Sequence, residues 1–200
     1  MGSLMIVNGS PRAPRSNSKK LIEIFRAFWH DPVTVWDARS RDLIPCCTQT
    51  GLYRDLLLVF PLYADTAPIP VMRFLKELEQ HLPAGKPTVH VLINCGFIEP
   101  EQNRIACDMV RLFCRQNGFP FGSALLIGSG EAILNTPFAF LVRRKLRTLA
   151  RAVRQEKPVN LTVTMPLSKK LFIRASTTYW TQYGAKNGIS REQMETLEIE

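Results

Sequence analysis

The sequence predicts a doubly wound α/β fold, in which a five-stranded parallel sheet is covered by helices on both faces. Three observations lead to this expectation: short apolar runs end in turn residues, segments of helical periodicity separate these runs, and the runs are apolar throughout. Strands that alternate with helices form βαβ units, and the strands of such units lie parallel. A fold of this class binds its ligand at the carboxyl ends of the strands.

The first half of the chain contains two strands and one well-marked helix. Residues 4–7 form a short apolar strand, which Asn8-Gly9-Ser10-Pro11 ends as a turn. The following helix is capped by short polar side chains and has an apolar face; these are Ser16, Asn17 and Ser18, then Leu21, Ile22, Ile24, Phe25 and Phe28. Residues 33–36 form the second strand, ended by Asp37, and the polar stretch 38–53 is too irregular to predict a helix.

Three further strands follow, at residues 55–60, 89–93 and 124–127. Between them we expect a helix that begins near Pro68 or Pro70, and a helix from about 100 to 117 that Gly118 ends. The second of these helices is expected to turn its large apolar residues inward, namely Ile105, Met109, Leu112 and Phe113. A long helix at about 138–155 closes the core.

The remaining residues predict an extension rather than a second domain. We expect one domain over residues 1–200, with a core of about 1–157 and a C-terminal helical extension of about 158–200. The extension begins with a strand or extended piece at 159–164, has a helix around 179–186 and ends with a short helix that opens at Ser190.

The N-terminus and the cysteines both indicate a cytoplasmic protein. The first nine residues lack the basic lead-in and long apolar stretch of a secretory signal, and no run is long enough to span a bilayer. The five cysteines are an odd number, and Cys46 and Cys47 are adjacent, so they predict reduced thiols rather than a disulfide framework. No Cys-x-x-Cys pair occurs, and no metal site is expected.

The net charge of +9 has its main source late in the chain. This part of the sequence has ten basic residues and a single acidic one, Glu156. The basic residues are Arg143, Arg144, Lys145, Arg147, Arg151, Arg154, Lys157, Lys169, Lys170 and Arg174. Such a block could attract a phosphorylated nicotinamide cofactor, an acidic redox partner, nucleic acid or anionic lipid. We interpret it as a solvated helix face, with no nucleic-acid partner, and we expect no membrane contact because the apolar stripe of this helix must cover the sheet.

The turn after the first strand is the loop that best predicts a ligand. Gly9 allows close approach of the backbone, the serines and Asn17 offer short donors, and Arg12 can neutralise an anion at the start of a helix. An ordinary capped helix after a tight turn would show the same residues. The loop has neither Gly-x-Gly-x-x-Gly nor a Walker A motif, so a monophosphate is the ligand that it favours.

Gly9-Ser10-Pro11-Arg12 with Ser16-Asn17-Ser18 resembles the phosphate loop of the NAD(P)H-dependent FMN reductase and flavodoxin-like oxidoreductase family. Pro61-Leu62-Tyr63 resembles the second flavin loop of that family, and the order of elements matches over about the first 155 residues. Asn94-Cys95-Gly96-Phe97 and Gly128-Ser129-Gly130 fall where the family has its later site loops. Two departures concern the stretch 38–53, where the second helix of the family is shortened or lost and the cysteine spacing of iron–sulfur members is missing.

The resemblance implies a flavodoxin-like fold and FMN as cofactor. The phosphate would lie on Ser10, Arg12, Asn17 and Ser18 at the helix that Ser16 opens. The flavin ring would lie beside Pro61, Leu62, Tyr63 and Ala64, and its pyrimidine edge would meet Asn94, Cys95, Gly96 and Phe97, with Asp65, Glu99 and Gln102 at the rim. NAD(P)H would be the electron donor, and a quinone, a flavin or a protein the acceptor. The chemistry is then that of the flavin, with no catalytic side chain and no metal, and family members suggest a homodimer by analogy only.

Two other functions stay open on the sequence. One is a flavodoxin-type electron carrier that binds FMN without oxidising a nicotinamide, although carriers of that type are typically acidic. The other is a non-catalytic module of the same fold that uses its basic face to bind a partner or a membrane surface.

Overall fold

The computed structural model describes residues 3–12 and 16–196, and its sheet has six parallel strands. The strands lie in the order β2-β1-β3-β4-β5-β6. Their bounds are β1 (Leu4–Asn8), β2 (Val33–Asp37), β3 (Asp55–Pro61), β4 (Thr88–Asn94), β5 (Phe121–Ile127) and β6 (Asn160–Val163). Because β2 and β3 flank β1 on opposite sides, the direction of winding reverses at β1, and a ligand is expected beyond its carboxyl end.

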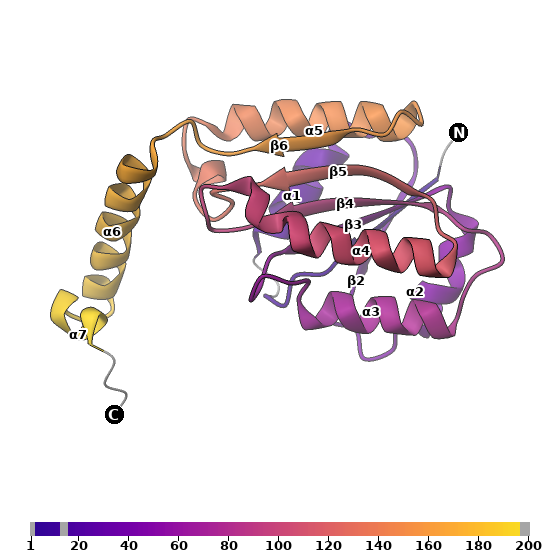
Figure 1. Ribbon diagram of the computed structural model, residues 1–200, viewed down its shortest axis with the longest axis horizontal. Helices are drawn as coiled ribbons and strands as arrows, with labels where there is room; N and C mark the ends of the chain where they lie inside the picture. Colours follow the sequence, from indigo (N-terminus) through magenta and orange to yellow (C-terminus); the bar gives the residue numbers. More distant parts are fainter. Residues whose placement is uncertain (1–2, 13–15, 197–200) are drawn as a thin grey trace. The chain divides into compact units, whose positions relative to one another are not determined.

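Helices cover both faces of the sheet (Figure 1). The helices are α1 (Asn17–Arg26), α2 (Ile44–Gln49), α3 (Ile69–Gln80), α4 (Arg104–Asn117) and α5 (Ala139–Arg154), with 3₁₀ turns η1 (Thr50–Leu52), η2 (Pro100–Asn103) and η3 (Ile133–Asn135). Helices α1 and α5 pack against each other on one face, and α2 packs against α3 on the other, where α4 also lies. The doubly wound arrangement that the sequence predicts is therefore confirmed.

The central strands are buried on both faces, which explains why their sequence is apolar throughout. Leu56, Leu58 and Phe60 of β3 belong to the core under α2, α3 and α4, whereas Leu57 and Val59 alternate with them and are equally buried. On the other face α5 buries a stripe at helical spacing, whose members are Val142, Leu146, Leu149 and Val153. Each such side chain stabilises the fold by roughly 1.5–3 kcal/mol.

The predicted count of five strands is wrong, because the extended piece at 159–164 pairs with β5 as a sixth strand. Strand β6 has four residues and lies at the edge of the sheet, where only Val163 is buried. An edge strand needs apolar residues on one face only, so it has no continuous apolar run that could identify it.

Two other expectations are corrected by burial. The stretch 38–53, too irregular to predict a helix and expected to have one shortened or lost, contains the six-residue α2 and η1, because Cys46 and Cys47 are fully buried there and Pro45 lies in the first turn of α2. On α4 the expected inward face is only partly correct: Ile105 and Leu112 are 60% and 44% exposed, whereas Met109 is half-buried and Phe113 packs against the core. Its buried residues are smaller, namely Ala106, Cys107, Val110 and Cys114. Residue size alone therefore gave the wrong orientation for two of the four residues.

The chain divides into two units, Met1–Met165 and Pro166–Glu200. The second unit contains α6 (Lys169–Lys186), which begins far earlier than the expected residue 179, and α7 (Arg191–Glu195). Ser168 caps α6, and Ser190 with Gln193 forms a capping box that opens α7. No helix in the described part of the chain is both long and apolar enough to cross a membrane.

Candidate functional site

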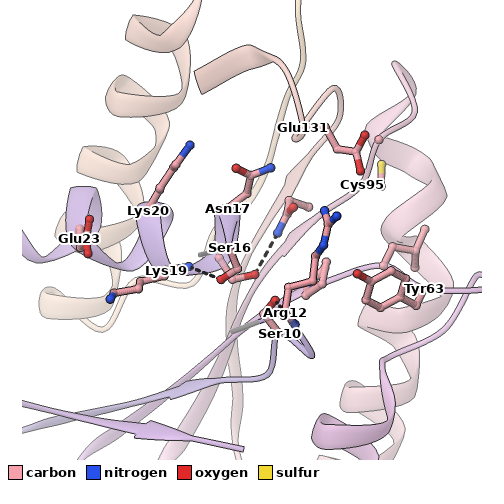
Figure 2. Close-up of a pocket in the computed structure, with 15 residues that line it drawn as sticks. Ser10, Arg12, Ser16, Asn17, Lys19, Lys20, Glu23, Tyr63, Cys95 and Glu131 are labelled. Carbon is pink, nitrogen blue, oxygen red and sulfur yellow. Dashed lines mark hydrogen bonds between the residues drawn. The ribbon is translucent and has the colours of Figure 1, made fainter. Parts of the chain in front are cut away.

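A pocket of about 390 Å³ lies where the loops after β1, β3, β4 and β5 meet (Figure 2). Its volume falls in the range of roughly 300–1,000 Å³ that is usual for small-molecule sites. The lining residues are Ser10, Arg12, Ser16, Asn17, Ser18, Lys19, Lys20, Glu23, Pro61, Leu62, Tyr63, Asn94, Cys95, Gly96 and Glu131. The pocket thus occupies the position that the winding of the sheet predicts.

One end of the pocket is built to hold an anion. Ser16 caps α1, and its Oγ accepts a hydrogen bond from the backbone N–H of Lys19 at 3.2 Å. The Oγ of Ser10, a residue only 1% exposed, accepts from the backbone N–H of Arg12 at 3.3 Å and so fixes the turn. Backbone N–H groups in the first turn of a helix have no intrahelical acceptor, and the helix dipole is positive there. An anionic group of a ligand would find both N–H donors and the Arg12 guanidinium at this end.

Gly9 is required by the packing of α3 against this turn. A Cβ atom on Gly9 would lie 2.1 Å from Cγ2 of Val71, well inside van der Waals contact. The N–H of Gly9 also donates to the carbonyl of Val59 at 2.8 Å, which ties the turn to β3. The loop therefore starts from a fixed point on the packed core.

The second side of the pocket is formed by Pro61, Leu62 and Tyr63 at the end of β3. The N–H of Leu62 donates to the carbonyl of Asn94 at 2.8 Å, so this loop is fixed to the end of β4. In Figure 2 Arg12 extends between the first turn of α1 and Tyr63, whose side chain is partly exposed. An aromatic ring and an apolar loop opposite a cationic end suit a ligand with a flat ring and an anionic tail.

Tyr63 is positioned by a tight turn with strained backbone. Its N–H and carbonyl exchange hydrogen bonds with Thr66 at 3.2 and 2.9 Å, and the two central residues have positive φ, 45° at Ala64 and 59° at Asp65. The left-handed region favours glycine, tolerates aspartate, and costs alanine roughly 1 kcal/mol.

We expect Ala64→Gly to stabilise the protein by roughly 0.5–1 kcal/mol, because glycine adopts positive φ without the Cβ clash. The free energy of unfolding in urea measures the effect. Ala27→Gly is the matched control, since Ala27 is exposed and has φ of −63°, so that glycine there should destabilise the protein. A destabilised Ala64→Gly protein would contradict the strain at this turn.

The third side of the pocket connects β4 to α1. Asn94 is 4% exposed, and its Nδ2 donates to Ser18 Oγ at 3.4 Å and to the carbonyl of Phe60 at 3.3 Å. Gly96 lies close to Asn94 along the chain, and the side chain of Glu131 lies against Gly96. A Cβ on Gly96 would be 3.6 Å from Oε2 of Glu131. The carboxylate of Glu131 thus lines the pocket beside Cys95 and Gly96, away from the anion-binding end (Figure 2).

Cys95 is a packed residue in this wall. It is 4% exposed, and Asn103 Nδ2 donates to its Sγ at 3.3 Å. Burial raises the pKa of the Cys95 thiol above its ordinary value, so the thiol stays protonated at neutral pH. Burial likewise raises the pKa of Cys107, and those of Cys46, Cys47 and Cys114 to about 12.

We expect the five cysteines to resist alkylation in the native protein, because the thiolate is the reactive form. Iodoacetamide at pH 8, followed by mass spectrometry, should label less than roughly a tenth of each thiol in the time that labels the urea-unfolded chain fully. Rapid labelling of Cys95 would assign it a reactive role instead.

The raised pKa values also mean that the unfolded chain loses its thiol protons at a lower pH than the folded chain does. The contribution of the buried thiols to the free energy of unfolding should therefore be fully present below about pH 8 and be lost as the pH rises above it.

The pocket brings together eleven of the thirteen residues that the sequence analysis placed at the cofactor, from all three predicted loops. Ala64 and Phe97 do not line it; Ala64 shapes the turn that holds Tyr63, and Phe97 is exposed. The rim residues Asp65, Glu99 and Gln102 are not among the lining residues either. Sequence reasoning missed Lys19, Lys20, Glu23 and Glu131, although the first three follow the predicted helix cap directly and Glu131 follows Gly128-Ser129-Gly130.

Comparison with known proteins shows the fold. No family model matches the chain, and no curated protein matches its sequence. Among solved structures, an NADH:FMN oxidoreductase in its apo form is 16% identical with a TM-score of 0.61, over 78% of this chain and 90% of that one. A flavodoxin of Fusobacterium nucleatum bound to flavin mononucleotide is 14% identical with a TM-score of 0.60, over 78% and 99%. An azoreductase from Bacillus anthracis is 15% identical with a TM-score of 0.57, over 78% and 100%. The flavodoxin-like fold that the sequence predicts is thereby confirmed.

Proposed function

We propose that the protein is an FMN-dependent oxidoreductase that passes electrons from NAD(P)H to a quinone, flavin or protein acceptor. The observation that carries the proposal is the pocket, in which an anion-binding helix start, an aromatic loop and a polar third loop surround one cavity. Structures of the same fold include an NADH:FMN oxidoreductase and an NAD(P)H:quinone oxidoreductase from Methanothermobacter marburgensis. Their similarity supports the proposal through the fold alone.

The residues present fit FMN at both ends of the pocket. Ser10, Arg12, Asn17 and Ser18 would hold the phosphate, for which the first turn of α1 offers N–H donors and positive charge. Pro61, Leu62 and Tyr63 would contact the ring, and Asn94, Cys95 and Gly96 its polar edge. When bound, FMN supplies the chemistry of accepting a hydride from nicotinamide and releasing electrons to an acceptor. The contribution of the chain is binding and orientation, and the proposal includes no catalytic side chain.

A second function is a flavodoxin-type electron carrier, which the fold similarity to flavodoxins favours. The two functions differ in whether a nicotinamide reduces the cofactor. The proposal also includes a cytoplasmic location and a homodimer, and light scattering after gel filtration tests the dimer.

The visible spectrum of the purified protein, with added FMN if it is colourless, tests the cofactor. A yellow protein that bleaches with NADH or NADPH under anaerobic conditions is the result that we expect. A yellow protein that neither nucleotide bleaches would favour the carrier. A protein that takes up no FMN would contradict both.

A further inference from the structure

The positive charge of the protein is concentrated on one layer of helices. Helices α1 and α5 carry nine basic side chains and a single acidic one, Glu23. The basic residues are Lys19, Lys20, Arg26, Arg143, Arg144, Lys145, Arg147, Arg151 and Arg154. On the opposite face, α3 and α4 carry five basic and three acidic side chains, and α2 has no charge. The α1–α5 layer thus has an excess of eight positive charges, close to the net charge of +9 of the whole chain.

Two of these arginines are held in place on the surface. The guanidinium of Arg147 lies 5.2 Å from the ring centroid of Phe28, and that of Arg154 lies 5.4 Å from Trp29. Arg154 also donates to the carbonyl of Phe28 at 3.0 Å. Stacking leaves guanidinium N–H groups available at the edge, and a side chain that is already ordered loses less entropy when it binds a carboxylate.

Neighbouring acidic groups do little to neutralise this layer. Glu156 follows α5, but it pairs with Arg54 at 2.9 Å. Like charges crowded on one helix lower its stability slightly, so the contacts of Arg147 and Arg154 with Phe28 and Trp29 account for only part of this concentration of charge. The apolar stripe of α5 is buried against the sheet, and among the large apolar side chains of α1 and α5 only Phe140 is exposed. This face therefore has one such side chain rather than the set that inserts an amphipathic helix into a lipid surface.

The basic layer reaches the candidate site. Lys19 and Lys20 are exposed residues of α1, and both line the pocket. A partner that binds across α1 and α5 would therefore lie beside the entrance to the cofactor. We call the exposed set Lys19, Lys20, Arg26, Arg143, Arg144, Arg147, Arg151 and Arg154 the α1–α5 surface.

We propose that the α1–α5 surface docks an acidic electron-carrier protein, which exchanges electrons with the cofactor in the adjoining pocket. The proposal rests on the proposed function and names the class of its protein partner. Each oxidised one-electron carrier accepts one electron, so two carriers are reduced for each fully reduced FMN that is oxidised, and the protons of the reduced flavin pass to water. Complementary charge accelerates the association of two proteins and selects among partners, and salt weakens this electrostatic attraction.

The probe for this surface is a plant-type [2Fe–2S] ferredoxin, a small acidic one-electron carrier. Its affinity for the protein is measured by calorimetry, with and without FMN, at about 20 mM and about 300 mM salt. We expect binding at low salt that weakens by at least about tenfold at high salt. Absence of binding at low salt, or binding indifferent to salt, would overturn the proposal.

Two variants of equal net charge locate the binding surface. The test variant is Arg143→Glu with Arg144→Glu and Arg151→Glu, all exposed on α5. The control variant reverses three exposed charges on the opposite face, Lys76→Glu with Arg104→Glu and Arg115→Glu. We expect the test variant to bind ferredoxin at least about tenfold more weakly and the control to stay within about threefold of wild type. Circular dichroism confirms that both are folded.

Three further results decide between explanations. Equal losses in the two variants would show an effect of net charge alone and overturn the docking surface. Tighter binding to vesicles of phosphatidylcholine and phosphatidylserine, or to a duplex DNA, than to ferredoxin would overturn the choice of partner. If the protein takes up no FMN but ferredoxin still binds the test variant more weakly than the control variant, the result would contradict the proposed function and support the docking surface.

Discussion

Replacing Ser10 and Arg12 together by alanine is expected to weaken FMN binding by at least about 100-fold, which corresponds to about 2.7 kcal/mol. A charge-assisted hydrogen bond from Arg12 is worth roughly 1.5–3 kcal/mol and the Ser10 hydroxyl about 1 kcal/mol more. The Ser10 hydroxyl also accepts a hydrogen bond from the backbone N–H of Arg12 at 3.3 Å. Loss of this hydroxyl therefore loosens the turn that orients the backbone N–H groups. Quenching of flavin fluorescence on titration measures the dissociation constant.

The matched control is Ser40→Ala with Arg41→Ala, an adjacent serine and arginine in the loop after β2. Arg41 is exposed, Ser40 is half-buried, and neither lines the pocket, so FMN affinity should stay within about threefold of wild type. An unchanged dissociation constant in the Ser10 and Arg12 variant would remove the phosphate from this end of the pocket. An equal loss in the control variant would indicate a general effect on folding.

The residues of the candidate site could be predicted where they lie directly at the end of a strand or at the start of a helix. Ser16 lies at the helix start, Pro61 directly after β3 and Asn94 at the end of β4, and the carboxyl ends of parallel strands meet at one edge. Glu131 was missed because its place in the pocket depends on how the loop after β5 folds over Gly96, for which the sequence has no periodic signal.

Fold prediction failed where tertiary contacts decide the structure. Strand β6 is defined by its pairing with β5, and α2 by the burial of Cys46 and Cys47, rather than by a local pattern. On α4 two helical stripes compete, and the smaller side chains of Ala106 and Cys107 face the core. Small residues allow close approach of a helix to a sheet, so the size of an apolar residue does not by itself show which way it faces.

A buried polar network joins three strands at the end of the sheet away from the pocket. Asp55 and His90 are 2% and 3% exposed, and Nε2 of His90 lies 3.2 Å from Oδ1 of Asp55. The backbone N–H of Ser123 donates to Nδ1 of His90 at 2.8 Å, so that nitrogen carries no proton and Nε2 is the donor to Asp55. Arg54 completes the network through Nε, which donates to Oδ2 of Asp55 at 2.7 Å.

Gly122 is part of the same arrangement. A Cβ on Gly122 would lie 2.3 Å from Cε1 of His90, so the imidazole ring fills the space above the glycine. The histidine therefore serves as a bridge between β3 and β5 and as packing volume. A smaller side chain would leave both roles unfilled.

His90→Ala should destabilise the protein by about 3–4 kcal/mol, because it leaves a cavity, an Asp55 oxygen without its donor and a Ser123 N–H without its acceptor. For a chain of this length the melting temperature should fall by roughly 6–16 °C. His81→Ala is the control, since His81 is half-buried and pairs with Glu77 at 3.1 Å near the surface, where the loss should stay below about 1 kcal/mol. Because β4 carries His90 and Asn94 toward opposite ends, FMN affinity should change less than about threefold while His90→Ala is folded. Equal stability losses in the two histidine variants would contradict the network, and a selective loss of FMN binding would connect it to the pocket.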